Sequence, residues 1–285
     1  MILPQVIANA LCAASLIGLV AIGLLLTYQL QRFIFFAYGV VLAFAPYICW
    51  TLVKIGFDSL WASACLAILA SVILGIVFER VLHRPARGRG MGSFGLLLLS
   101  IGCYIVIENL LALVFGNDIK SFQFAWRDTH YEFCGAWISL LQVFTFSATI
   151  VVSIILWCSL RFTRIGRQLK AVANDVELAR VIGVDIDRIY LWAIMISCGL
   201  AGMVGIFTAL DVDMTPTMGM RPLMLGLVAL IIGGGTVWGA IAGAGLVATA
   251  LHLGVLYISA RWQDGIAFLI LLAFLFLRLR WSSKN

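Results

Sequence analysis

The amino-acid sequence predicts an all-α, polytopic membrane protein with about eight transmembrane helices and one glycine-rich segment that is broken or re-entrant. Of the 285 residues, 63% are hydrophobic and 11% are charged, whereas a soluble domain carries roughly 25% charged residues. The apolar residues also form charge-free runs at Val6–Tyr28, Phe33–Val53 and Ser59–Phe78. Each run is longer than the ~18 residues that indicate a membrane span. Because the bilayer core has no water to pair backbone groups, each run is expected to cross as a helix.

The predicted spans follow one another along a single transmembrane domain, residues 1–285. We place them at about 6–30, 33–53, 59–79, 94–116, 137–160 and 189–210, followed by a broken apolar stretch at 222–258 and a last span at 262–278. The first run is expected to be retained rather than cleaved as a signal peptide. Its first basic residue is Arg32, and its apolar core is too long for a signal peptide.

The basic residues predict the orientation of the chain. Arg32 and the segments Glu79–Gly90, Arg161–Arg188 and Arg278–Asn285 together hold 14 of the 19 Lys and Arg residues. By the positive-inside rule this side is cytoplasmic, which places the N-terminus outside and the C-terminus inside. Residues 222–258 must then cross an even number of times, as two short crossings or as one re-entrant hairpin around the break that begins at Gly233.

Several classes of function find no support in the sequence. The seven cysteines form no CxxC pair and show no metal-ligand spacing, so no metal site is expected. Gly233–Gly235 lacks the lysine of a P-loop, so any ATP-driven step needs a separate subunit, and no cofactor is expected. The chain has neither an HExxH nor a GxSxG motif, and we expect no catalytic residues and no enzyme activity. The net charge of +6 follows from membrane topology, so no nucleic-acid partner is expected.

The segment Gly166–Arg188 is more structured than a simple connection. Ala171, Asp175, Ala179 and Gly183 recur every four residues, which would place them along one helical strip. If Asp175 instead caps a second short helix beginning at Val176, the segment consists of two pieces. Gly183 fits a C-terminal helix cap.

Two uses of this segment remain open on spacing alone. Val172, Val176 and Ala179 form a small apolar face that suits docking into a groove of a partner protein. Alternatively, the segment rests on lipid headgroups through basic residues such as Arg164 and Arg167.

Polar residues and glycines within the spans are candidates for a translocation pathway. Glu108 is the one carboxylate well inside a span, and it either lines a pathway or makes a helix–helix contact, together with Asn109. The glycines from Gly233 to Gly245 either line a cavity or allow tight helix packing. His83 is expected to belong to a basic loop.

Five motifs, in register along nearly the whole chain, resemble the permeases of the branched-chain amino acid ABC transporter family. The pattern Ala-x-x-x-Asp-x-x-x-Ala-x-x-x-Gly of the family's coupling loop is met at 171–183, and its following basic residue at Arg188. The other four motifs are LIGLVAIGLLLTYQLQRFIFFAYG (16–39), ERVLHRPARG (79–88), IGCYIVIENLLALVFGND (101–118) and GGGTVWGAIAGAGL (233–246). The chain departs from the family pattern at Phe35, Tyr38, Glu108 and Thr236-Val237-Trp238, where the family has asparagine, histidine, glutamine and Ser-Ile-Pro.

The resemblance implies a permease subunit of an ABC importer in a bacterial inner membrane, which carries branched-chain amino acids or a related small polar solute by alternating access. It implies three kinds of protein partner: ABC ATPase subunits, a second permease that is identical or homologous, and an external solute-binding protein. The implied ATPase-coupling residues are Gly166, Arg167, Ala171, Asp175, Ala179, Gly183 and Arg188. The implied pathway residues are Tyr38, Gly39, Glu108, Asn109, Gly233, Gly234, Gly235 and Gly239. A stand-alone secondary transporter or channel is the alternative, because broken helices and a membrane carboxylate suit it as well.

Overall fold

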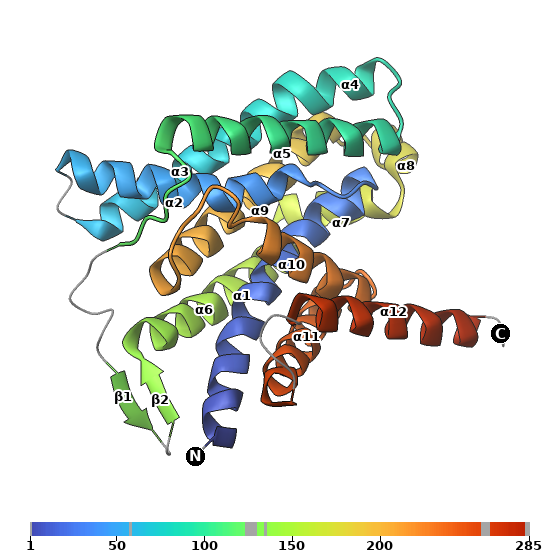
Figure 1. Ribbon diagram of the computed structural model, residues 1–285. Coiled ribbons are helices and arrows are strands. Elements are labelled where there is room, and N and C mark those ends of the chain that lie inside the picture. The colour runs from blue at the N-terminus through green and yellow to red at the C-terminus, as the bar shows by residue number, and fades with distance from the viewer. Residues whose placement is uncertain (1, 57–58, 123–129, 134–135, 258–262, 283–285) are drawn as a thin grey trace. The chain divides into compact units, whose positions relative to one another are not determined.

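The computed structural model describes residues 2–56, 59–122, 130–133, 136–257 and 263–282, and most of them are helical (Figure 1). The elements, in chain order, are α1 (Ile2–Gln31), α2 (Ala37–Ile55), α3 (Leu60–Val77), the π-helix η1 (Phe78–His83), α4 (Arg84–Gly88), α5 (Ser93–Phe115), β1 (His130–Phe133), β2 (Ala136–Ser139), α6 (Leu140–Phe162), α7 (Arg164–Asn174), α8 (Val176–Val181), α9 (Ile186–Asp211), α10 (Met220–Ile232), α11 (Val237–Tyr257) and α12 (Gln263–Ser282).

The predicted fold class is confirmed. Within the described ranges, seven helical segments are long and apolar enough to cross a membrane, and the apolar stretches Met220–Ile232 and Gly265–Phe274 are shorter. Two local differences concern the predicted boundaries. The span expected to start at 137 starts instead at Leu140, after an antiparallel hairpin of β1 and β2. The span expected to end near residue 79 continues as one helical segment from Leu60 to Gly88.

The chain groups into two compact units. The first unit comprises residues 1–25, 125–149 and 224–285, and the second comprises residues 26–124 and 150–223. The helices α1, α6 and α10 each contribute residues to both units. The sequence-based prediction of a single domain stays a prediction.

In the second unit, α2, α3 and α9 pack against one another, and α5 packs on α2. Glycines make the close approach possible. A Cβ atom on Gly205 of α9 would overlap the carbonyl group of Leu42 in α2, and one on Gly202 would come within 2.7 Å of the Ser71 hydroxyl in α3. α9 is therefore held against both neighbours by contacts that leave no room for a side chain.

In the first unit, α1 packs against α10 and α11. A Cβ on Gly226 of α10 would overlap the side chain of Val20, and one on Gly18 would lie 3.7 Å from Ala244 of α11. The side chain of Gln5 joins α1 to β2, because its amide nitrogen donates to the Trp137 carbonyl (2.9 Å) and its oxygen accepts from the Trp137 amide (2.7 Å).

The predicted break in the apolar stretch 222–258 is confirmed between α10 and α11. Gly234 and Gly235 adopt positive φ angles of 64° and 78°, which favour glycine. The Thr236 hydroxyl then accepts from the Gly239 amide at 3.0 Å, capping α11. With 13 and 21 residues, α10 and α11 are about 20 and 31 Å long at 1.5 Å per residue. Only α11 is as long as the roughly 30 Å hydrocarbon core is thick.

Candidate functional site

The segment predicted to contact a partner consists of two helices rather than one. α7 begins where the Thr163 hydroxyl accepts from the Gly166 amide at 3.1 Å. It ends at Asn174, because the next residue, Asp175, has an extended backbone (φ −150°, ψ 113°). The Asp175 carboxylate accepts from the amides of Glu177 (2.9 Å) and Leu178 (3.0 Å), so it caps the N-terminus of α8. The two-piece alternative is therefore confirmed, and no continuous strip runs through Asp175.

Glycine and aspartate define the end of this segment. Gly183 has φ +85°, and the Val184 amide donates to the Ala179 carbonyl at 3.0 Å, which matches the expected C-terminal cap. The Asp185 carboxylate then accepts from the Arg188 amide at 3.2 Å and starts α9. The segment is thus a defined pair of short helices that leads directly into the buried helix α9.

The inward and outward faces of the segment Gly166–Arg188 have opposite environments. Val172 and Ala179 of the predicted apolar face are each only 1% exposed, so they hold the segment against the protein. The outward face is also apolar. Its residues Leu178, Val181 and Ile182 are 61%, 83% and 66% exposed, and we call them the α8 patch. The i, i+3, i+4 spacing of these three residues is visible in the sequence. The sequence-based prediction named only the other apolar face, which contains Val172 and Ala179 and which the structure places inward.

Of the remaining predicted coupling residues, Gly166 and Arg167 contact the end of α6, and the Ala171 carbonyl accepts from the Asp175 amide at 3.0 Å. A Cβ on Gly166 would overlap the backbone of Leu160 at the end of α6. The exposed Arg167 donates to the Phe162 carbonyl at 3.2 Å. Arg32, which has a positive φ of 56°, donates to the Ala173 carbonyl in the last turn of α7 at 3.1 Å.

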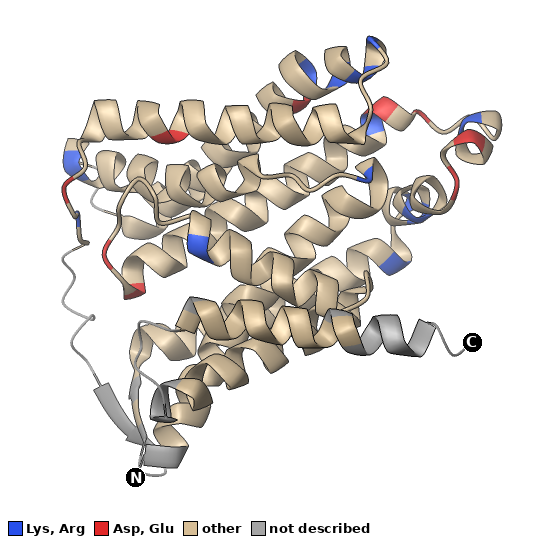
Figure 2. Ribbon diagram, turned by 45° about the vertical axis from the view of Figure 1, so that its right-hand side comes forward, with Lys and Arg blue, Asp and Glu red and all other residues tan. Residues whose placement is uncertain are grey.

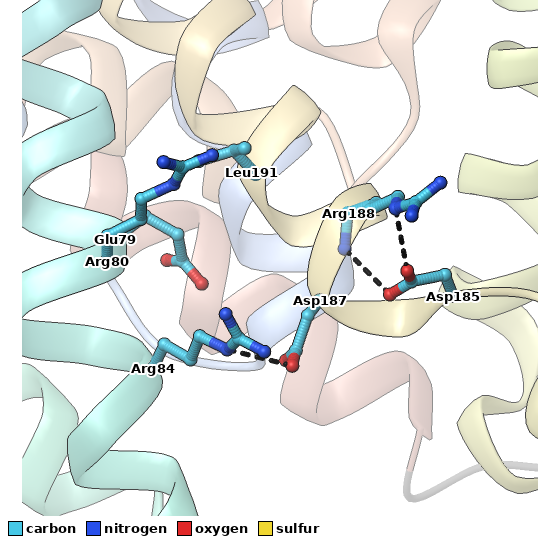
Figure 3. A pocket seen from close by; sticks show the side chains of 7 residues that line it. All are labelled: Glu79, Arg80, Arg84, Asp185, Asp187, Arg188 and Leu191. Carbon is cyan, nitrogen blue, oxygen red and sulfur yellow. Dashed lines mark hydrogen bonds and ion pairs between the residues drawn. The ribbon is translucent and has the colours of Figure 1, made fainter.

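Charged residues gather at helix ends and in connections, while the middles of the helices are almost free of charge (Figure 2). Arg84 of α4 pairs with Asp187 at the start of α9 (Nε–Oδ2 3.0 Å), and Arg188 pairs with Asp185 (Nε–Oδ2 2.8 Å). Figure 3 shows these pairs beside a cavity of about 280 Å³ that Glu79 and Arg80 also line. All four paired side chains are substantially exposed, at 47–80%.

A second set of charges, close by, is buried. The Glu79 side chain is 2% exposed and pairs with Arg87. His83, expected in a basic loop, is instead fully buried in η1 between the rings of Phe33 and Phe35. That expectation was wrong because the helix does not end at residue 79, and its apolar neighbours cover the imidazole.

Part of the predicted pathway forms one cluster in the second unit. A Cβ on Gly39 would lie 3.1 Å from the ring of Tyr104, and the Tyr104 hydroxyl donates to Glu108 at 3.1 Å. Glu108 is half-buried, and the adjacent Asn109 is exposed and donates to the Ile105 carbonyl of its own helix at 2.7 Å. Tyr104 was not among the predicted residues, although its position one helical turn before Glu108 was a usable signal.

Tyr38 directly precedes Gly39 in α2. It is fully buried, and its hydroxyl has no hydrogen-bond partner within the described part of the chain. The predicted glycines of the hairpin lie in the first unit. A Cβ on Gly239 would overlap the Gly233 carbonyl, and one on Gly243 would overlap the Ala229 carbonyl. These contacts are those of tight packing between α10 and α11, whereas Gly234 and Gly235 have open space around them.

The residues that the structure describes contain no group of three His, Cys, Asp or Glu side chains placed to hold a metal ion. What they contain is an exposed apolar helix on a folded segment, a polar cluster on the side of a membrane helix, and a glycine hairpin.

Comparisons with known proteins agree on one family. The family model for the permease component of the branched-chain amino acid transport system matches residues 6–275. The high-affinity branched-chain amino acid transport permease LivH of Escherichia coli K12 is 26% identical over 94% of this chain and 91% of its own length. BraD of Pseudomonas aeruginosa, with the same described role, is 28% identical over 95% and 93%.

A relative with a different solute in its name matches part of the chain. The autoinducer 2 import permease LsrC of Salmonella paratyphi B is 32% identical over 45% of this chain and 39% of its own length. No solved structure matches. Since the family model covers almost the whole sequence, this multi-pass membrane protein belongs to the family of branched-chain amino acid transport system permease components.

Proposed function

We propose that the chain is the membrane permease of an ABC importer, and that a separate ATPase docks on the α8 patch. The exposure of Leu178, Val181 and Ile182 carries this proposal. Leu178 and Val181 lie on the six-residue helix α8, and Ile182 follows directly after its end. Three large exposed apolar side chains outside the spans suit the apolar groove of a partner. Asp175 and Gly183 would serve this docking by fixing the two ends of α8.

The position of the segment supports a coupling role. It is tied at one end to α6 through Gly166 and leads at the other into α9, which packs on α2 and α3. A push on α8 would therefore reach helices of the membrane domain. In this assignment the side that holds the α8 patch is cytoplasmic, the N-terminus is outside, the C-terminus is inside, and the membrane is the bacterial inner membrane.

Glu108 supports a pathway that this chain encloses together with a second permease. α5 has only 17% of its most apolar window buried, and within it Glu108 is half-buried and Asn109 is exposed. Ionisable side chains within spans face protein or a water-filled cavity rather than lipid. We propose that a second permease, homologous or identical, covers this side of α5, and that both units of the chain contribute to one permease domain.

The proposed solute is a branched-chain amino acid or a related small polar solute that carries an ammonium group. The named roles of LivH and BraD support the first part. Glu108 supports the second, because a carboxylate in a pathway of low dielectric attracts a cationic group. An external binding protein would deliver the solute. The alternative of a stand-alone secondary transporter draws on the same carboxylate, but it gives the α8 patch no role.

Co-purification from gently solubilised membranes tests the proposal. Tagged wild-type protein is compared with Val181→Asp and Asp175→Arg. As a control, Ile119→Asp introduces the same charge at a residue that is 70% exposed in a different connection. We expect a P-loop ATPase to accompany the wild type and the control, and to fall at least about tenfold with the other two variants. If no ATPase accompanies the wild type, the importer proposal is wrong and the stand-alone transporter remains. If Val181→Asp retains the ATPase, the docking site lies elsewhere.

A further inference from the structure

Glu79 is a buried carboxylate at the point where α3 becomes the π-helix η1. Its side chain is 2% exposed. Both of its oxygens contact the guanidinium of Arg87, and the longer contact, Nη1–Oε2, measures 3.5 Å. The amide of Gln31 donates to Oε2 at 3.4 Å, and Nδ1 of His83 lies 3.6 Å from the same oxygen. A buried charge is tolerated when it is paired and hydrogen-bonded, and here Arg87 supplies the pairing and Gln31 a further hydrogen bond.

The π-helix places the two charged partners on one face. In a regular α-helix, residues eight positions apart point about 80° away from each other around the axis. Glu79 and Arg87 are eight residues apart, and the six residues Phe78–His83 form a π-helix. A π-helix turns less per residue than an α-helix. The packing of His83 against Phe33 (5.5 Å between ring centroids) and Phe35 (5.4 Å) holds this wider turn in place.

Arg87 has a second contact that reaches another element. Its guanidinium carbon lies 4.5 Å from the centre of the Tyr190 ring, within the range of a cation–π interaction. Tyr190 is 9% exposed and lies at the start of the second turn of α9. Seven residues before it, the segment 166–188 makes its Gly183 cap. Arg87 therefore connects the far end of α3 to the first turns of the helix into which α8 leads.

We infer that Glu79, Arg87 and Tyr190 form a latch that makes α3 and α9 move together when the segment 166–188 is displaced. The inference rests on the proposed coupling function. Arg87 is a positioning residue in this latch, since Glu79 fixes its guanidinium and the Tyr190 ring lies 4.5 Å from the guanidinium carbon. Without the latch, displacement of α8 would bend the start of α9 away from α4 instead of moving α3.

The space around the latch shows why a specific connection is needed there. A cavity of about 520 Å³, lined by Arg84, Arg180, Asp187 and Tyr190 among others, lies between α4 and the end of the segment. Close packing between α3 and α9 begins deeper in the bundle, where a Cβ on Gly75 would lie 2.7 Å from the sulfur of Cys198. Near the cavity, the exposed pair Arg84–Asp187 is the other ionic connection that the described residues make between α4 and α9. Exposed pairs hold weakly, whereas Glu79 and Tyr190 are buried and Arg87, which also lines the cavity, is 18% exposed, so the latch is the stronger of the two connections.

The test measures leucine taken up per ATP hydrolysed by the whole complex, permease with its ATPase and binding protein, in reconstituted vesicles. Arg87→Lys keeps the charge but loses the planar, two-pronged geometry. Tyr190→Leu keeps an apolar residue but loses the ring. Tyr190→Phe keeps the ring and is the matched control. We expect the first two variants to retain the ATPase and its hydrolysis while uptake per ATP falls roughly fivefold or more, and Tyr190→Phe to match the wild type.

The other outcomes overturn the latch. An unchanged ratio in both Arg87→Lys and Tyr190→Leu shows that no transmission passes through them. A parallel loss of uptake and hydrolysis, or loss of the ATPase from the complex, shows a role in folding or docking only. A wild-type complex that co-purifies with no ATPase overturns the proposed function itself, and the latch falls with it. The wild-type control thus separates the two failures.

Discussion

The helices α9 and α5 of the second unit are similar in length and hydropathy but differ in how much of each is buried. α9 has 26 residues and α5 has 23, and their most apolar 18-residue windows have mean hydropathies of 2.1 and 2.2. Yet 72% of the most apolar window of α9 is buried, against 17% for α5. Mean hydropathy thus indicates that a helix crosses the membrane, but it does not tell what covers the helix. In α9 the glycines decide this, because they let α2 and α3 approach.

The largest expected effect comes from breaking this close approach. Gly205→Val puts a side chain into the Leu42 carbonyl of α2, and we expect it to destabilise the protein by about 3 kcal/mol or more. The matched control is Gly102→Val in α5, because no described atom lies within 4 Å of a Cβ at Gly102. The amount of monodisperse protein after detergent extraction, and its thermal unfolding, measure both. Equal behaviour of the two variants would show that α9 is not packed as described.

A functional effect of intermediate size is expected in α5. Glu108→Gln keeps an oxygen that can accept from the Tyr104 hydroxyl, now at 3.1 Å from Glu108, but removes the charge. We expect the preference for leucine over its 2-oxo analogue, which lacks the ammonium group, to fall about tenfold, or ~1.4 kcal/mol. Competition uptake in vesicles measures this preference. An unchanged preference would remove Glu108 from the pathway and leave it as a partner of Tyr104 alone.

The smallest effect is expected where α9 begins. Arg84→Gln and Asp187→Asn each remove one partner of a pair that is 60% and 47% exposed. Because water screens such charges, we expect each change to alter the free energy of unfolding by less than about 1 kcal/mol. A double-mutant cycle followed by thermal unfolding isolates the interaction. A coupling energy well above 1 kcal/mol would show that this end of α9 is held as firmly as its middle.

The sequence was sufficient for the order of the helices and the break after Ile232, and it offered the cap at Asp175 as one of two alternatives. Each of these follows from local chemistry: long apolar runs, glycines with positive φ, and a carboxylate near free backbone amides. The prediction that a connection begins at Glu79 was made because charged residues usually end a span. It was wrong because the Glu79 carboxylate is buried. Its burial depends on Arg87, eight residues later and reached through a π-helix, and on the hydrogen bond from Gln31.

Contacts between residues that are far apart in the chain could not be predicted from the sequence. Examples are the contact of Tyr190 with Arg87 and the contact of Tyr104 with Gly39, which is 65 positions earlier in the chain. For Tyr104 only its position one helical turn before Glu108 was visible in the sequence. No spacing rule connects such pairs. The outward face of α8 was within reach, since Leu178, Val181 and Ile182 follow a helical period, but choosing which of two apolar faces is free requires the fold.

The α8 patch also has a consequence for the life of the newly made protein. Until a partner covers them, Leu178, Val181 and Ile182 face water with 61–83% of their surface. Exposed apolar surface of this kind promotes self-association and recognition by chaperones and proteases. A cell that makes this subunit in excess of its partner is therefore expected to degrade the surplus, so that the supply of the partner sets how many copies persist.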